Sequence, residues 1–469
     1  MSSTSDPANS SFEGADTPVP KSAQDNLKMS AFDVGILVAV SVVLNTLLTS
    51  FYGLKGSFLI KNVLHLSASD ASTFGIIAAI PAYLRPFMGT GADLFPLLGF
   101  HRRTYYILSW LLYAAGLLSM AATPTHEYSY GGVVMLTILY VAGANLLFVI
   151  MDAIMVSIGN VTGTIGRLQA IQQGLPLVMA LTFSSKLAGY VAQNWSYQRC
   201  FLIAGLLAAA GALVTLLIHE KPVGHHNDQH GNTLHEQHLT KLEDRRDMKA
   251  HAKVLGKALS SPGLWVCVVY VFYLILTPGT NTAQFYYSTV VIHLSAQQLG
   301  NLGMPGSAGS IIGTLIFLFF SRKLPTAAFV WGAFLGDMSV YPMLFFWHSY
   351  HAAEAIAFLS AVTGQLYYLC LLTFAAKACP KGIEASIYAL FVAATSLAGT
   401  LGDKLGSSIY DYFGPSHHHS ITYGWFVLLW SGIALTAIAA FMVPFLPRWA
   451  RDPQFERELE QSQSQPAAS

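Results

Sequence analysis

The sequence predicts an all-α membrane protein with twelve transmembrane helices in two pseudo-symmetric bundles of six. Of its 469 residues, 53% are apolar and 10% are charged, whereas about 25% of the residues in an ordinary soluble domain are charged. The apolar residues come in runs long enough to cross a bilayer, which takes roughly 20 residues per helix. A central hydrophilic stretch, 219–261, divides these runs into six and six.

Each expected span is one apolar run of the sequence. In chain order the runs are 33–60, 72–98, 104–122, 130–158, 166–192, 200–218, 263–292, 299–320, 326–347, 352–375, 384–407 and 423–443. A kink is expected at Pro81 in the second run, and a break at Pro278 and Gly279 in the seventh. Glycines spaced three or four residues apart from Gly300 to Gly313 give the eighth run a narrow face for close helix contact.

The chain is expected to divide into five parts. They are a cytoplasmic N-terminal tail (1–30), an N-terminal six-helix bundle (31–218), a cytoplasmic His-rich linker (219–262), a C-terminal six-helix bundle (263–446) and a cytoplasmic C-terminal tail (447–469). The bundles are expected to be internal repeats, because the segment that opens the fifth span at Gly166 resembles the one that opens the eleventh after Gly382.

Lysine and arginine gather on one side of the expected spans, and this sets the orientation. The loops on the side of both termini hold most of these residues, whereas the outer loops hold only Lys61 and Arg199. Both termini are therefore expected in the cytoplasm. Residues 1–29 include four acidic side chains, which a typical transit peptide avoids, so a bacterial inner membrane is the expected location.

Composition also argues against several classes of function. The net charge of +1 at pH 7 gives no reason to expect nucleic-acid binding. The four cysteines are scattered along the spans without metal-ligand spacing, so no disulfide framework, metal site or cofactor is expected. An integral-membrane enzyme is disfavoured, because the sequence has neither a phosphate-binding loop nor a nucleophile elbow.

The loop after the second span carries a spaced motif, which runs from Gly89 through Asp93 and Gly99 to Arg102 and Arg103. A Gly-x-x-x-Asp motif followed by glycine and paired arginines resembles the loop between helices 2 and 3 of the major facilitator superfamily, where it latches the cytoplasmic gate. The resemblance implies that Asp93, Arg102 and Arg103 form a gate, in which modest ion pairing holds one arrangement of the two bundles.

Three stretches together resemble the folate-biopterin transporter family of that superfamily. They are the long spacing from Asp93 to Tyr105, the Pro278-Gly279 region with the glycines that follow it, and the segment 380–390 that enters the eleventh span. The resemblance implies a secondary active transporter that works by alternating access, commonly a proton symporter, for folates, pterins or related anionic or zwitterionic heterocycles. The expected partners are then a small-molecule substrate, protons and the lipid bilayer, and a monomer is expected.

One departure from that family leaves the cargo open. Members usually carry an acidic and then a basic residue shortly after the aspartate of the fourth span, where this chain has Ser157 and Asn160 after Asp152. A major facilitator carrier for another small solute, such as a nucleoside, an amino acid or an S-adenosylmethionine-like molecule, is therefore the alternative. An integral-membrane enzyme is a more remote one.

Polar side chains inside the spans are the candidate site residues, because an ionisable group there costs roughly 2.5 to 3.5 kcal/mol even on lenient scales. Arg85 suits bidentate binding of a substrate carboxylate, with a structural pair to Asp152 as the alternative. Gln172 and Gln173 suit the mixed donor and acceptor edge of a pterin. Lys186 follows Gln172 by fourteen residues, about four turns, and so is expected near the same face to hold an anionic tail. Polar contacts between helices are the alternative for these residues.

In the second half, the candidate substrate residues are Asn281, Gln284 and Tyr287 after the helix break and Gln365 in the tenth span. The half-helix after the break points its positive end toward the middle of the membrane. Aromatic rings in these spans, among them Tyr287 and Tyr368, suit stacking on a heterocycle. Ordinary packing is the alternative for each ring.

Asp152 and Asp337 are the candidates for proton coupling, because an embedded carboxyl can take up and release a proton as a cavity alternates between the two sides. Asp337 has no basic residue within one helical turn of the sequence. This favours a protonatable role, with packing against polar neighbours as the alternative. Lys55 and the pair Asp403-Lys404 lie toward the outer ends of their spans, where snorkelling or an outer gate pair explains them.

Overall fold

The structure is a computed structural model that describes residues 29–95, 97–98, 100, 102–218, 220, 256, 260–321, 324–379, 384–417 and 419–455. The predicted N-terminal tail lies almost wholly outside these ranges, as do residues 456–469 of the predicted C-terminal tail and most of the predicted linker.

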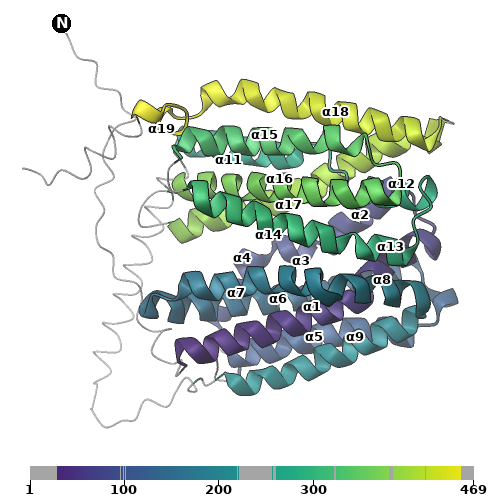
Figure 1. The fold of residues 1–469 in the computed structure, drawn as a ribbon. Coiled ribbons are helices and arrows are strands. Elements are labelled where there is room, and N and C mark those ends of the chain that lie inside the picture. Colours follow the sequence, from purple (N-terminus) through teal and green to yellow (C-terminus); the bar gives the residue numbers. More distant parts are fainter. Residues whose placement is uncertain are drawn as a thin grey trace, which may run out of the picture.

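The first half of the chain forms helices that run back and forth along one axis (Figure 1). Their bounds are α1 (Ala31–Asn62), α2 (Ala68–Ala78), α3 (Ile80–Tyr83), α4 (Arg85–Leu94), α5 (Arg103–Ala122), η3 (Thr125–Glu127), α6 (Tyr130–Thr162), α7 (Ile165–Met179), η4 (Ala180–Ser184), α8 (Ser185–Asn194), α9 (Tyr197–Gly211) and η5 (Ala212–Leu217). The segment η4 is a π-helical turn between α7 and α8.

The second half repeats this plan. Its bounds are α11 (Pro262–Leu276), α12 (Asn281–Val290), α13 (Ala296–Asn301), α14 (Gly303–Phe320), α15 (Thr326–Leu344), α16 (Tyr350–Lys377), α17 (Glu384–Tyr412), η7 (Pro415–His417), α18 (Ile421–Met442), η8 (Val443–Phe445) and α19 (Arg448–Arg451). The predicted break in the seventh span is confirmed, since α11 ends at Leu276 and α12 begins at Asn281.

In the described ranges, ten helical segments are long and apolar enough to cross a membrane. The predicted spans 72–98 and 384–407 are not among them, so the count of twelve stays a prediction. The first of these two spans is divided into α2, α3 and α4, with interruptions at Ala79 and Leu84 on either side of Pro81. The segment α17, with 29 residues, covers the second.

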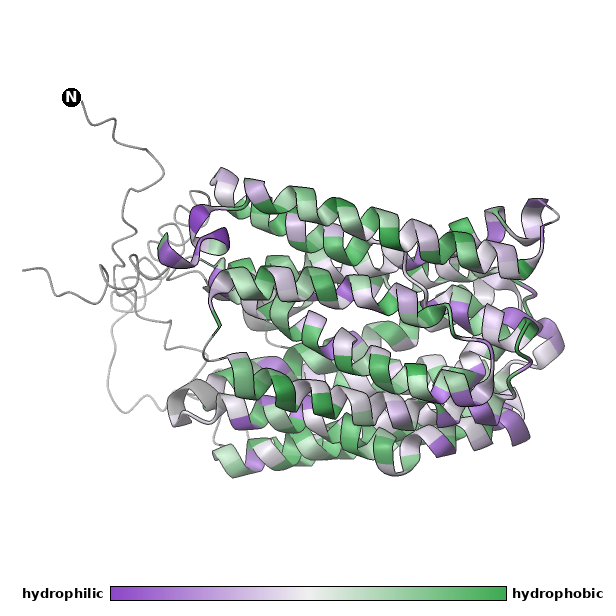
Figure 2. Cartoon of the chain, turned by 45° about the horizontal axis from the view of Figure 1, so that its top comes forward, coloured by the Kyte–Doolittle hydropathy of each residue, from purple (hydrophilic) through white to green (hydrophobic). Residues whose placement is uncertain are grey.

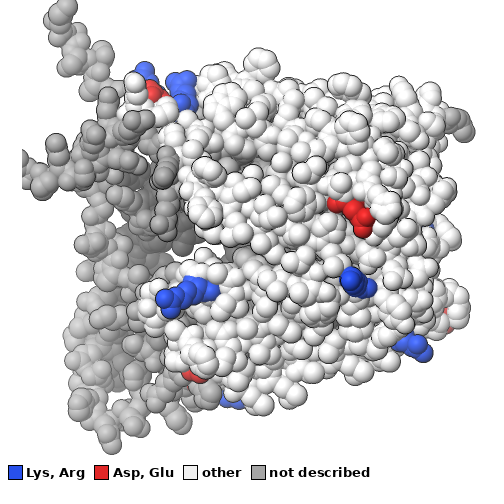
Figure 3. Space-filling view, in the orientation of Figure 1, with Lys and Arg blue, Asp and Glu red and all other residues white. Residues whose placement is uncertain are grey.

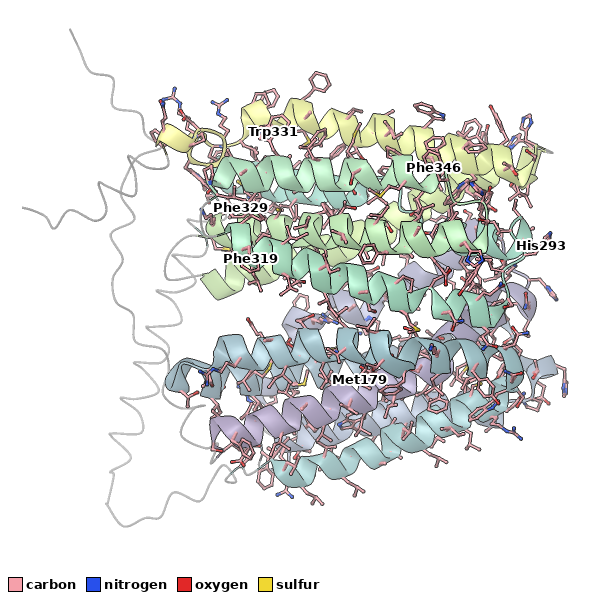
Figure 4. All side chains as sticks on the ribbon, in the orientation of Figure 1. Met179, His293, Phe319, Phe329, Trp331 and Phe346 are labelled. Carbon is pink, nitrogen blue, oxygen red and sulfur yellow. The ribbon has the colours of Figure 1, made fainter. Side chains whose placement is uncertain are left out.

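The outer surface of the described helices matches a hydrocarbon environment. Figure 2 shows green, apolar residues along the lengths of the helices and purple, polar residues gathered toward their ends. Figure 3 shows few charged side chains on the visible face. Phe319, Trp331 and Phe346 in Figure 4 are 79%, 41% and 65% exposed, although they belong to apolar spans or their ends. The chain is therefore a multi-pass membrane protein.

The helices form two bundles, each with its own hydrophobic core. The N bundle, α1 to η5, encloses one buried cluster that includes Leu37, Trp110 and Ile154. The C bundle, α11 to α18, encloses two clusters, one around Tyr270 and Phe374 and one around Trp425. In Figure 1 the N bundle occupies the lower half of the view and the C bundle the upper half. We call the end of the molecule where α1 begins and α18 ends the terminal face, and the other end the opposite face.

The two bundles meet mainly toward the opposite face, where α2 packs on α17 and α8 packs on α13. Ser72 Oγ donates to Ser407 Oγ at 2.7 Å and to Asp403 Oδ2 at 3.2 Å. The backbone N–H of Ser69 donates to Asp411 Oδ2 at 2.6 Å, and Lys404 Nζ donates to the carbonyl of Ser69 at 2.9 Å. Most of the hydrogen bonds that join the bundles in the described ranges gather at this end, whereas the one between Tyr83 Oη and Thr400 Oγ1, 2.7 Å apart, lies nearer the middle of α17. The opposite face is therefore closed.

Glycine makes the close contact between α8 and α13 possible. A Cβ atom on Gly300 of α13 would lie 2.3 Å from the Cα of Gly189 on α8, a distance that real Cβ atoms do not reach. The predicted glycine face of the eighth span thus serves two neighbours. Gly300 and Gly303 approach α8, whereas Gly309 and Gly313 approach the α16 carbonyls of Phe358 and Val362.

Replacing Gly300 with alanine is expected to destabilise the closed opposite face by about 1–3 kcal/mol, the usual cost of overpacking a tight contact. The purified Gly300→Ala variant should melt at a lower temperature than the native protein. The matched control is Gly306→Ala, because the nearest heavy atom to a Cβ at Gly306 lies 4.0 Å away. Equal melting temperatures for the two variants would contradict a backbone-to-backbone contact at Gly300.

Candidate functional site

Arg85 is the first residue of α4 and follows the interruption of the helix at Leu84. Its Nε donates to Oδ1 of Asn145 on α6 at 2.6 Å, and Asn145 Nδ2 in turn donates to the carbonyl of Val141 at 2.8 Å. Within the described residues, no other hydrogen bond or ion pair engages Arg85. Asn145 thus fixes the guanidinium through one nitrogen, and the two terminal nitrogens stay available for a bidentate anion.

Asp152, two turns further along α6 than Asn145, forms the second part of the site. Its Oδ1 accepts a hydrogen bond of 2.7 Å from Nε2 of Gln172 on α7. Arg85 and Asp152 interact electrostatically, but they form no direct ion pair in the part of the chain that the structure describes. The predicted structural pair is therefore a longer-range attraction, and each charge has its own neutral partner.

Tyr368 on α16 is the residue of the C bundle that lies near Arg85. Its side chain is 48% exposed, and it interacts electrostatically with Arg85 across the interface between the bundles. Asp152 is also exposed. A carboxylate and a guanidinium are costly against acyl chains, so we infer that these groups face the space between the bundles. The structure thus brings together Arg85, Asp152 and Gln172, and it adds Asn145 and Tyr368.

Gln173 and Lys186 are exposed and lie on the same spanning segment as Gln172. The expected alignment of Lys186 with Gln172 is not kept, because the π-helical turn η4 lies between them. A π turn holds one more residue than an α turn, so it shifts the register by about one position, or roughly 100° around the helix. Lys186 therefore leaves the face that carries Gln172.

The break between α11 and α12 is buried against α17. Gly279 N–H donates to the carbonyl of Gly402 at 2.8 Å, and the hydroxyl of Tyr341 donates to the carbonyl of Pro278 at 3.1 Å. A Cβ atom on Gly402 would lie 2.8 Å from the carbonyl oxygens of Ile275 and Thr277. Neighbouring helices thus satisfy the backbone groups that the break releases, as an interruption at membrane depth requires.

Asp403 caps the half-helix that follows the break. Its Oδ1 accepts from the N–H of Thr282 at 3.1 Å, and its Oδ2 accepts from the Thr282 hydroxyl at 2.6 Å. The same Oδ2 accepts from Ser72 of the N bundle. The positive end of α12 therefore already faces a carboxylate of the protein, and Asp403 links the helix break to the closed contact between bundles.

The other candidates in the C bundle make no hydrogen bond or ion pair with Arg85 in the described ranges. Asn281 is exposed and Gln284 is half-buried near the start of α12. Tyr287 is buried, and its ring stacks on Trp425 with centroids 4.8 Å apart, an arrangement typical of core packing. Gln365 lies beside α14, since its Cβ is 3.0 Å from where a Cβ on Gly313 would stand.

Asp337 of α15 lies in a separate polar cluster inside the C bundle. Its Oδ2 accepts from the hydroxyl of Thr277, at the helix break, at 3.3 Å and from the hydroxyl of Thr436 on α18 at 3.1 Å. The tyrosines at 270, 341 and 367 are close enough to interact with it electrostatically. No lysine or arginine pairs with Asp337 in the described ranges, so neutral donors alone stabilise its carboxylate form.

The predicted gate is described only in part, because the side chain of Asp93 lies outside the described residues. Arg102 is buried at the start of α5. The carboxylate of Glu220 accepts from the backbone N–H of Arg102 at 3.1 Å and from that of Arg103 at 2.8 Å. Glu220 thus supplies the cap that α5 otherwise lacks. Sequence reasoning missed Glu220, and its position just after the sixth apolar run was the available signal.

The comparisons with known proteins decide the family. The sequence profile of the BT1 family matches residues 48–465, which is most of the chain. This chain belongs to the BT1 family.

The curated relatives of this BT1 family member include the folate-biopterin transporter of Synechocystis sp., 26% identical over 370 residues, or 76% of this chain and 71% of the relative. They also include "Probable folate-biopterin transporter 4" of Arabidopsis thaliana, 22% identical over 471 residues, or 88% of this chain and 94% of the relative. These relatives are transporters, not enzymes. The predicted resemblance to folate-biopterin transporters is confirmed.

The fold comparison agrees. A crystal structure of a D-xylose-proton symporter superposes with a TM-score of 0.64 at 13% identity, covering 90% of this chain and 100% of the symporter. At this identity the match shows the fold alone. The BT1 family member therefore has the all-helical fold of the major facilitator transporters, as the sequence predicts.

Proposed function

We propose that this protein is a secondary active transporter that carries folate, a pterin or a related anionic or zwitterionic heterocycle by proton-coupled symport. The observation that carries the proposal is the polar group in which Asn145 positions Arg85, Gln172 donates to Asp152, and Tyr368 of the C bundle lies near Arg85. The membership of the BT1 family and the names of the relatives support the choice of solute.

The chemistry of the polar group matches such a solute. The terminal nitrogens of Arg85 fit a carboxylate in a bidentate manner. The Asp152 carboxylate and the Gln172 amide offer an acceptor and mixed hydrogen-bonding capacity to a pteridine edge, and the exposed Tyr368 ring offers a stacking face. The site therefore provides one element for each part of a folate-like molecule.

Alternating access explains how the solute crosses. We place both termini in the cytoplasm of a bacterial cell, with the protein in the inner membrane. The arginines at 102, 103, 167, 448 and 451 at the terminal face support this orientation. With that face in the cytoplasm, the closed opposite face is the closed outer side that an inward-facing conformation requires. Transport then requires the Ser72–Asp403 and Ser69–Asp411 contacts to open while the terminal face closes.

Asp152 and Asp337 have different roles in this proposal. Asp152 belongs to the substrate group, so a bound substrate changes its electrostatic surroundings. Asp337 lies among hydroxyl groups at the helix break, where a proton can bind and leave without a competing cation. Thr277 joins Asp337 to the break, and Asp403 joins the break to the contact between bundles, so protonation at Asp337 can bias the conformational equilibrium.

The test is uptake of radiolabelled folic acid and of biopterin into liposomes that contain the purified protein. An inward proton gradient is expected to drive saturable accumulation above the outside concentration, and a protonophore should abolish it. Accumulation that ignores the proton gradient would contradict the coupling. The absence of uptake for folates, pterins and related heterocycles would contradict the proposed solute class.

A further inference from the structure

A pocket of about 350 Å³ opens between the bundles near the opposite face, well apart from the Arg85 group in the fold. Its polar lining comes from Lys55, Lys61, Asn62, Gln193, Thr289 and Ser295. The two lysines give the pocket positive charge, and none of the described residues that line it is acidic. The pocket therefore favours an anion. The loop residue His293, next to the lining residue Leu294, marks this end of the molecule in Figure 4.

Lys55 is the buried wall of the pocket. It is only 9% exposed, its Nζ donates to the carbonyl of Ala192 at 2.9 Å, and it lies over the ring of Tyr197 at 4.6 Å. An ammonium group has three N–H donors, and the carbonyl accepts from one. No carboxylate pairs with Lys55 in the described ranges. Snorkelling does not explain this lysine, because its amine is held inside the protein at the pocket.

Lys61 approaches the pocket from six residues, nearly two helical turns, further along α1. Its amine donates to the hydroxyl of Thr289 on α12, and it lies 5.5 Å from the ring centre of Tyr286 and 5.9 Å from that of Phe285. These three partners belong to the C bundle, whereas Lys61 belongs to the N bundle. The second positive charge of the pocket therefore already spans the contact between the bundles.

We propose that this pocket binds a small oxyanion, a carboxylate or a sulfate-like group, between the amines of Lys55 and Lys61. Such an anion accepts the unused N–H donors of Lys55 and neutralises two like charges that share one cavity. The exposed amides of Asn62 and Gln193 at the rim supply further donors. The site is separate from the proposed substrate group.

The position of the pocket gives the anion a conformational effect. Lys55, Lys61 and Gln193 come from the N bundle, whereas Thr289 and Ser295 come from the C bundle. In addition, the side chain of Gln193 accepts from the N–H of Ala296 at 3.0 Å. A ligand that contacts both walls binds best when they are together, so it stabilises the conformation with a closed opposite face.

The experiment measures the melting temperature of the purified full chain while sodium glutarate or sodium sulfate replaces sodium chloride at constant ionic strength. A saturable rise is expected with at least one of them, and the difference between the two shows which oxyanion the site prefers. The rise should be lost in Lys55→Gln and in Lys61→Gln and kept in Lys55→Arg. The control Arg199→Gln removes an exposed charge near the same end and should keep the rise.

Two results would overturn the proposal. One is the absence of a rise in the native protein, and the other is an undiminished rise in both glutamine variants. If Lys55→Gln elutes as an aggregate, Lys61→Gln carries the test. The melting temperature is measured without folate and without transport. The anion test therefore stays valid even if the proposed solute class is wrong.

Discussion

Replacing Arg85 with glutamine is expected to weaken folate binding and slow folate counterflow about 100-fold, which corresponds to ~3 kcal/mol. Arg85 is positioned by one hydrogen bond from Nε to Asn145. Its terminal nitrogens have no partner in the described ranges, so under the proposed function they are the groups that meet a substrate carboxylate. Glutamine removes both the charge and the paired N–H donors. The effect should therefore appear in binding as well as in every mode of transport.

Two further variants sharpen this test. Arg85→Lys keeps the charge but loses the planar pair of donors, so it should fall between the native protein and Arg85→Gln. Arg448→Gln removes an exposed arginine at the terminal face and should transport normally. The assignment is wrong if Arg85→Gln binds folate with native affinity, or if all three variants lose the same amount of activity.

Replacing Asp337 with asparagine is expected to abolish gradient-driven accumulation while leaving counterflow intact. Asparagine keeps an oxygen that can accept from Thr277 and Thr436, as Asp337 does at 3.3 and 3.1 Å. It cannot take up and release a proton. Since no hydrogen bond or ion pair joins Asp337 to Arg85 or Asp152 in the described ranges, substrate binding should survive. The measurement compares folate counterflow without a gradient and folate uptake with one, in the same liposomes.

Asp152→Asn is the matched comparison for Asp337→Asn. Asp152 touches the substrate group through Gln172, so its replacement should reduce counterflow as well as accumulation. Equal loss of both activities in Asp337→Asn would indicate a role for Asp337 in folding or binding instead of coupling. Unchanged accumulation in Asp337→Asn would show that the coupling proton binds to another group.

Local chemistry made part of this structure predictable. Pro278 and Gly279 cannot continue a helix without releasing backbone groups, so the break between α11 and α12 followed from two residues. Arg85, Asp152 and Gln172 were selected because ionisable and amide groups are costly inside apolar runs, and the structure shows a hydrogen bond between Gln172 and Asp152. The tight contacts of Gly300 and Gly309 followed from their spacing.

Long-range contacts account for what was missed. Asn145 holds Arg85 across 60 positions of sequence, and Asp403 caps α12 across 121. Neither pairing has a local signal. The π-helical turn η4 moved Lys186 away from the face of Gln172, because a single extra residue per turn breaks the helical periodicity used to align them. The burial of Tyr287 on Trp425 likewise depends on how α12 packs against α18.

Under the proposed function, the polar group around Arg85 and Asp152 carries a folate-like solute through alternating access. Equilibrium counterflow tests it most directly: liposomes that contain the purified protein are loaded with unlabelled folate and diluted into a trace of labelled folate. We expect a transient, saturable uptake of label that Arg85→Gln lacks. Uptake no greater than that of protein-free liposomes, for folate, biopterin and related heterocycles alike, would contradict it.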